Sequence, residues 1–150
     1  MLIQAWSITH PALTFAQQHD YDGFAAAELE ARAELFNPPS GYLALLRISG
    51  RNPAAVKRRA ELLAKRCREV IEHHRRAGER VFDEGVQVLG PVPSPMERIN
   101  QRTRWQLLLR GRSRSPLRQV LHALRPLLGT EGRGGDETRA SVDVDPQSFG

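Results

Sequence analysis

The feature that most constrains this fold is a long amphipathic helix pattern lying between two short apolar runs. Asn52-Pro53 supplies a capping side chain and a proline at the first helical position, and Gly78 ends the pattern. Its inward positions recur at steps of three and four, namely Val56, Ala60, Leu63, Cys67, Val70 and His74. Such a stripe has to be buried against a partner, and the flanking runs supply strands for a sheet.

A second helix with the same opening follows, beginning at Ser115-Pro116 and ending before Gly129. Its apolar positions are Leu117, Val120, Leu121, Leu124, Leu127 and Leu128. Strands are predicted over 42–48, 86–89, 103–110 and 139–145. In the last of these, Ala140, Val142 and Val144 alternate inward.

The resulting order is β-α-β-β-α-β. It predicts an α+β fold in the split βαβ arrangement, a four-stranded antiparallel sheet with two helices on one face. The prolines of residues 90–95 predict a turn between the second and third strands. The glycine-rich residues 129–137 predict a mobile loop.

The first 39 residues differ in plan. Residues 2–6 predict a short strand, Pro11 a helix start, and residues 21–35 a helix capped by Asp20. That helix must stop before Asn37-Pro38-Pro39, because proline disfavours helix in the residue before it. We therefore expect residues 1–39 to form a strand and helical linker, and residues 40–150 to form the α+β domain.

Composition excludes several classes of protein. The single cysteine, Cys67, cannot form an internal disulfide or a multi-cysteine zinc site, and it fits a reducing cytosol. Its place in the helix stripe indicates a core residue rather than a nucleophile. No apolar run approaches the length of a membrane span, and the N-terminus lacks a secretory pattern. We expect a cytoplasmic protein with no membrane partner.

Positive charge is concentrated in the second half of the chain. The net charge is +5, and all basic residues but Lys57 and Lys65 are arginines. Residues 1–50 hold two arginines against five acids, so the rest carries +8. Between residues 98 and 118 there is no acid, and the segment holds Arg98, Arg102, Arg104, Arg110, Arg112, Arg114 and Arg118. Such asymmetry favours a polyanionic partner, most simply nucleic acid.

Residues 102–114, RTRWQLLLRGRSR, divide by strand alternation. Trp105, Leu107 and Leu109 are expected beneath the helices. The opposite set, with Leu43, Leu45, Arg47 and Leu89, is expected on an open sheet face and comprises Arg104, Gln106, Leu108 and Arg110. Arg98, Arg102, Arg112, Arg114 and Arg118 are expected in turns or at a helix start, where they favour phosphate contacts.

Patterns for catalysis are missing from the sequence. There is no phosphate-cradling G-x-x-x-x-G-K-[ST] loop. Neighbouring histidines His73 and His74 point about 100° apart on a helix, so we expect no metal site from them. We find no set of nucleophile, base and orienting acid, and therefore expect no catalysis by this chain alone.

Several blocks resemble a known family. They are LIQAWSITHPAL at residues 2–13, HDYDGFAAAELEARAELFNPPSGYLALLRISG at 19–50, VLGPVPSPMERINQRTRWQLLLRG at 88–111 and VDVDPQSF at 142–149. Together, in this order, they resemble the C-terminal region of primosomal protein N′, the PriA family of replication-restart helicases. The resemblance covers nearly the whole chain.

The resemblance implies a terminal domain of an ATP-dependent 3′-to-5′ DNA helicase in bacteria. Residues 1–39 would then be a remnant of the second helicase lobe with its linker, and residues 40–150 a DNA-binding domain. The family's ATP, magnesium and zinc sites lie upstream, so we expect no cofactor here. The implied partners are single-stranded or forked DNA, the helicase lobes, primosome proteins and single-strand-binding proteins.

Two alternatives remain open at the sequence level. The open sheet face is equally suited to docking on helicase lobes or primosome partners, with little DNA binding. A ribosomal-type module that binds RNA is the third possibility. Each predicts a different binding partner for the same face.

Overall fold

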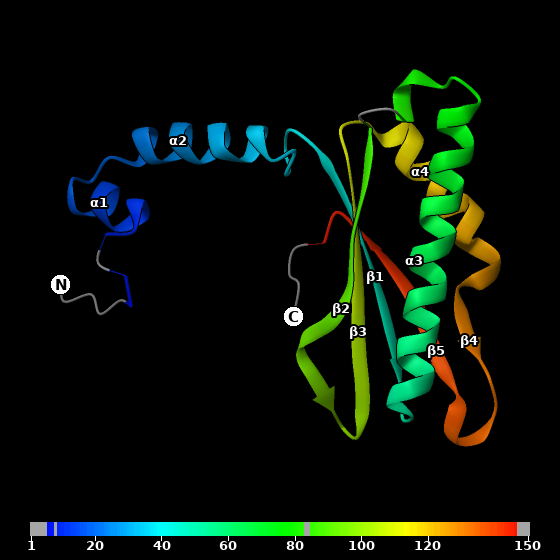
Figure 1. Cartoon of the computed structure of the whole chain (residues 1–150). Coiled ribbons are helices and arrows are strands. Elements are labelled where there is room, and N and C mark those ends of the chain that lie inside the picture. The colour runs from blue at the N-terminus through cyan, green and yellow to red at the C-terminus, as the bar shows by residue number, and fades with distance from the viewer. Residues whose placement is uncertain (1–5, 8, 83–84, 147–150) are drawn as a thin grey trace.

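The computed structural model describes residues 6–7, 9–82 and 85–146, and within these ranges the side chains of residues 97–99 are not described. Two N-terminal helices, α1 (Pro11–Gln17) and α2 (Tyr21–Glu34), stand clear of the rest of the chain (Figure 1). Asp20 caps α2 as predicted, because its Oδ1 accepts the backbone N–H of Gly23 at 2.8 Å. Neither helix has a buried residue. The strand predicted over residues 2–6 lies outside the described residues except for Trp6, which is in an exposed bend.

Five antiparallel strands form one sheet in the order β2-β3-β1-β5-β4. They are β1 (Tyr42–Gly50), β2 (Val86–Ile99), β3 (Arg102–Gly111), β4 (Gly129–Glu131) and β5 (Thr138–Val144). The α+β class and the antiparallel sheet are confirmed. The expected count of four strands is wrong, because Gly129–Glu131 pairs with β5. The segment predicted as a loop therefore contains an edge strand and a 3₁₀ turn, η3 (Gly134–Asp136).

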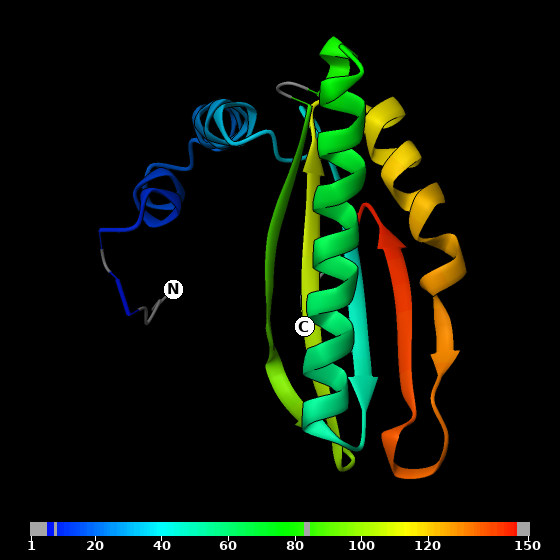
Figure 2. The ribbon, with the colours of Figure 1, turned by 45° about the vertical axis from the view of Figure 1, so that its right-hand side comes forward.

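The two long helices, α3 (Pro53–Arg76) and α4 (Arg114–Leu124), cover the same face of the sheet (Figure 2). The predicted stripe of α3 is buried, with Val56, Ala60, Leu63 and Cys67 fully enclosed. They pack on Leu107 and Leu109 of β3 and on β1 residues, while Trp105 packs at the edge of this core. Phe82, in η1 (Arg80–Phe82), stacks on the His74 ring at 4.4 Å between centroids and closes one end.

The proline-rich residues 90–95 do not form the predicted turn. They belong to β2, which continues to Ile99 with register shifts at Leu89/Val92 and Pro93/Arg98. β2 is an edge strand, where prolines can stand without breaking ladder bonds on both sides. The hairpin instead turns at Asn100 and Gln101, which both have positive φ, at 49° and 61°. Positive φ at both central residues is what a two-residue hairpin loop of type I′ requires.

Candidate nucleic-acid interface

The face of the sheet opposite α3 and α4, here called the outer face, carries the polar side chains of the strands. Leu107 and Leu109 are buried under the helices, so alternation places the intervening residues of β3 on the outer face. The same rule and the strand register assign to it Arg104, Gln106, Leu108, Arg110, Leu43, Leu45, Arg47, Ser49, Arg139, Ser141 and Asp143. The division predicted for β3 matches this pattern.

The expectation that Leu43 and Leu45 line an open apolar surface is wrong. They are only 5% and 0% exposed. β1 is the central strand, and Leu45 lies opposite Leu108 on one side and Asp143 on the other. Leu89, on the edge strand, does remain 42% exposed. The apolar part of the outer face is therefore confined to its β2 side.

Strand pairing brings two arginines from distant segments to one row of the outer face. Ser49 of β1 pairs with Arg104 of β3 on one side and with Arg139 of β5 on the other. Antiparallel partners are about 5 Å apart at Cα, which puts the two arginine Cα atoms about 10 Å apart. The small Ser49 side chain between them leaves room for both guanidinium groups.

A cavity lies at the end of the sheet beyond this row. Arg51, Arg102, Gly134 and Glu137 line it, with a volume of about 230 Å³. Arg51 and Arg102 directly follow and precede the last paired residues, Gly50 and Thr103. Arg51, Arg102, Arg104 and Arg139 together form what we call the arginine strip.

The arginine strip lacks partners within the described part of the chain. No hydrogen bond or ion pair is made there by its four side chains. Arg47, by contrast, forms an ion pair with Asp143 at 2.7 Å on the same face. Arg51 and Arg139 are exposed, and Arg102 and Arg104 are half-buried. Guanidinium groups that outnumber the neighbouring carboxylates, as these four outnumber Glu137, favour binding of an anion from solution.

The seven predicted site arginines do not form one cluster. β3 rises about 3.4 Å per residue, so Arg102 and Arg112 lie roughly 30 Å apart at opposite ends of the sheet. Arg102 and Arg104 belong to the arginine strip. Arg110 lies in between, and its Nη2 donates to Gln87 Oε1 at 2.7 Å. The Arg98 side chain lies outside the described residues.

At the far end, two arginines lie over aromatic rings. Arg112 lies 4.0 Å from the centroid of Phe36, and Arg114 lies 4.8 Å from that of Tyr42. Arg118 is exposed on α4. The Phe36 contact ties the end of the N-terminal helical segment to the loop after β3. Arg112 and Arg114 therefore pack against aromatic rings of the chain itself, a role that the sequence did not indicate.

Arg51 and Arg139 were not predicted as site residues. The alternation of β5 did place Arg139 outward. The missing information was which strands are neighbours, because only the β3-β1-β5 order brings Arg104 and Arg139 to the same row. Nothing in the sequence around Arg51 marks it as a site residue, because its only notable feature is its position before Asn52, the cap of α3.

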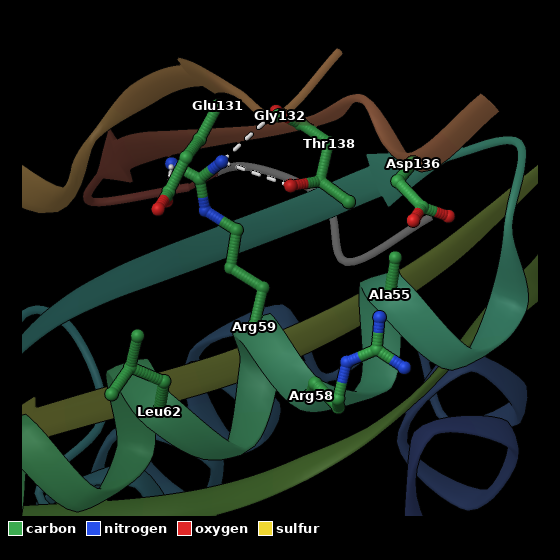
Figure 3. A pocket seen from close by; sticks show the side chains of 8 residues that line it. All are labelled: Ala55, Arg58, Arg59, Leu62, Glu131, Gly132, Asp136 and Thr138. Atoms are coloured by element: carbon green, nitrogen blue, oxygen red, sulfur yellow. Dashed lines mark hydrogen bonds and ion pairs between the residues drawn. The ribbon is translucent and has the colours of Figure 1, made fainter. Parts of the chain in front are cut away.

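A different arginine, Arg59 of α3, is buried inside the fold, and both of its terminal nitrogens form hydrogen bonds there (Figure 3). Its Nη1 donates to the backbone oxygen and Oγ1 of Thr138, both at 2.9 Å. Its Nη2 donates to the carbonyls of Leu127 and Gly129 and lies 3.3 Å from Glu131. These bonds hold the β4–β5 hairpin against α3. We therefore assign Arg59 and the cavity around it a structural role.

Other site types receive no support from the part of the chain that the structure describes. No group of three histidine, cysteine, aspartate or glutamate residues there is arranged to hold a metal ion. No described helix is long and apolar enough to cross a membrane. Burial raises the pKa of the Cys67 thiol to about 12, which keeps it protonated and unreactive at neutral pH.

The geometry defines an α+β domain with helices on one face of its sheet and, on the other, four arginines that make no hydrogen bond or ion pair with the described residues. Residues 33–147 match the family model described as the primosomal protein N C-terminal domain. The chain belongs to this family, as its sequence blocks indicated.

Curated relatives agree with this assignment. Over 99% of its length the chain is 32% identical to the replication restart protein PriA of Synechocystis sp. and 31% identical to that of Haemophilus influenzae. It is also 32% identical to a probable replication restart protein PriA of Deinococcus radiodurans. The chain spans only 16%, 18% and 14% of the lengths of these three relatives.

Proposed function

We propose that this chain is a non-catalytic DNA-binding domain that holds single-stranded or branched DNA through its outer face. The observation that carries the proposal is the arginine strip, four guanidinium groups with no acid partner among the described residues. Arginines on a sheet bind the phosphate backbone without reading bases, so binding is sensitive to salt and has little sequence preference. Arg98, Arg110, Arg112, Arg114 and Arg118 extend the contact along the sheet and beyond it.

The name of the relatives, replication restart protein PriA, supports a proposal for the larger protein in which this domain acts. We propose that residues 40–150 are the C-terminal domain of a replication-restart helicase of the bacterial cytoplasm. Residues 1–39 would link this domain to the second helicase lobe. In that setting the ATP, magnesium and zinc sites belong to parts of the parent protein outside this chain. Helicase lobes, primosome proteins and single-strand-binding proteins are its protein partners.

A second candidate is a protein-docking module. It is favoured by the exposed apolar side chains of β2, where Leu89, Val92 and Met96 are 42%, 46% and 53% exposed. An apolar edge of this kind suits a protein surface rather than a phosphate backbone. Docking on β2 does not involve Arg139, which lies on β5 three strands away, so the two activities are compatible.

Fluorescence anisotropy tests the proposal directly. Labelled single-stranded DNA, forked DNA and RNA of matching sequence are titrated with the chain across a salt series. DNA binding that weakens steeply with salt supports the proposal. Absence of DNA binding even at low salt would leave the docking function, and a clear preference for RNA would favour the ribosomal-type alternative.

A further inference from the structure

The cavity at the end of the sheet has the composition of an anion site. Two guanidinium groups, from Arg51 and Arg102, line it together with Gly134 and Glu137. We propose that this cavity binds one phosphate group of a nucleic acid. The choice of nucleic acid as the source rests on the proposed function, whereas the affinity for phosphate follows from the cavity itself.

Three separate parts of the chain build the cavity. Arg51 follows β1, Arg102 begins β3, and Gly134 and Glu137 come from the connection between β4 and β5. The register of β1 with β3 and with β5 ends at this point, so the positions are fixed by two strand ladders. Side chains held from several directions can surround a tetrahedral anion, which arginines on one exposed strand cannot do.

The chemistry of the lining favours phosphate over a carboxylate or a metal ion. A guanidinium group offers a planar fork of N–H donors that matches two phosphate oxygens, and two such groups can bind three or four oxygens together. The volume of about 230 Å³ admits a phosphate with part of its hydration shell. Gly134 adds no side chain, so its backbone borders the space directly.

The net charge in and around the cavity is positive. Glu137 is the one carboxylate of the lining, and Arg51 and Arg102 outweigh it. Arg104 and Arg139 stand in the next row of the sheet and add two positive charges. Glu137 therefore opposes anion binding, and removing its charge should tighten binding.

Titration with inorganic phosphate, followed by amide chemical shifts of the full chain, tests the cavity without any nucleic acid. We expect saturable shifts at Gly134 and Glu137, lost in the double variant Arg51→Gln/Arg102→Gln and kept in the charge-matched control Arg58→Gln/Arg125→Gln. Glu137→Gln should strengthen phosphate binding by about threefold, as expected for removal of a partly screened charge. Absent shifts, or shifts unaffected by the double variant, would overturn the proposal.

Oligonucleotides then identify which phosphate is bound. Single-stranded DNA with a 5′-phosphate is compared with the same strand ending in a 5′-hydroxyl. A preference for the phosphorylated strand that disappears in Arg51→Gln/Arg102→Gln assigns a terminal phosphate. Equal binding of both strands, with a salt slope that falls by about 0.7 in the double variant, assigns a backbone phosphate.

The outcomes separate this inference from the proposed function. If the double variant binds both strands as the unaltered chain does, the inference about nucleic-acid phosphate is wrong, while DNA binding through the rest of the outer face stands. If the unaltered chain binds no DNA, the proposed function fails. The inorganic phosphate titration still decides whether the cavity is an anion site.

Discussion

Because Cys67 is buried, the free energy of unfolding is expected to fall at alkaline pH. Burial raises its pKa from the ordinary 9.0 to about 12, outweighing the opposing charge of Arg68. The protonated thiol is favoured in the folded state, so this contribution is complete below pH 9 and is lost as pH rises toward 12. Between these values the free energy of unfolding should fall by at most about 1.4 kcal/mol per pH unit from this group.

Urea unfolding at pH 8 to 11 measures the effect of Cys67. The variant Cys67→Ala is compared at each pH, because other groups also titrate in this range. The expected result is a smaller loss of stability with pH in the variant. Parallel pH profiles for the two chains would contradict the buried, protonated thiol.

The surroundings of Arg59 predict a measurable loss in the free energy of unfolding when this residue is substituted. Arg59→Met keeps an unbranched apolar side chain in place of the stem but leaves the carbonyls of Leu127, Gly129 and Thr138 without their donor. Buried unsatisfied acceptors predict a loss of about 3 kcal/mol in the free energy of unfolding, measured with urea. Arg58→Met, at the exposed neighbouring position, should change stability by less than about 0.5 kcal/mol. Equal effects of the two substitutions would contradict the structural role of Arg59.

Among the elements, α3 followed from the sequence most closely, whereas α4 begins at Arg114 after Ser113, not at the predicted Ser115-Pro116, and ends at Leu124. The period of α3 and its Asn52-Pro53 start are local, and its observed bounds agree with prediction. β4 was missed because it is three residues long, rich in glycine at its start, and stable only through its pairing with β5. β2 was predicted too short because an edge position, invisible in a single sequence, tolerates its prolines.

The caps of α3 and α4 allow a matched test at this scale. Asn52 Oδ1 accepts the backbone N–H groups of Ala54 at 2.9 Å and Ala55 at 3.4 Å. Asn52→Ala should therefore lower the free energy of unfolding by about 1 kcal/mol. Ser113 stands at the same position of α4 but makes no capping side-chain bond, so Ser113→Ala should have little effect. A larger loss from Ser113→Ala, measured by urea unfolding, would contradict this assignment of the caps.

For the whole molecule, the structure predicts that the domain folds without its N-terminal helices. α1 and α2 have no buried residues, and Arg112 over Phe36 is a surface contact of about 1 kcal/mol or less. Deleting residues 1–39 should lower Tm by about 5 °C or less, measured by circular dichroism. A molten or insoluble product would show that the helical segment belongs to the folding unit.

Which arginines lie together on the outer face depends on how the strands pair in the folded molecule. The concentration of arginines in the sequence identified a basic region that includes Arg102 and Arg104. It also grouped these residues with Arg112 and Arg114, which an extended strand carries to the other end of the sheet. Arg139 joins the arginine strip through pairing between segments about 90 residues apart, as in Ser49 with Arg139, and Arg51 joins it through the pairing of β1 with β3. Sequence proximity and spatial proximity differ most in a sheet, because strands separate neighbours and join distant segments.

The most direct test of the account compares two charge reversals of equal size. Arg104→Glu/Arg139→Glu alters the outer face, and Arg58→Glu/Arg125→Glu alters exposed positions on the helical side. DNA affinity of both variants is measured by anisotropy at several salt concentrations, after circular dichroism has verified folding. We predict that binding collapses in the first variant and falls only slightly in the second. Equal losses in both would mean that net charge, rather than the arginine strip, holds the DNA.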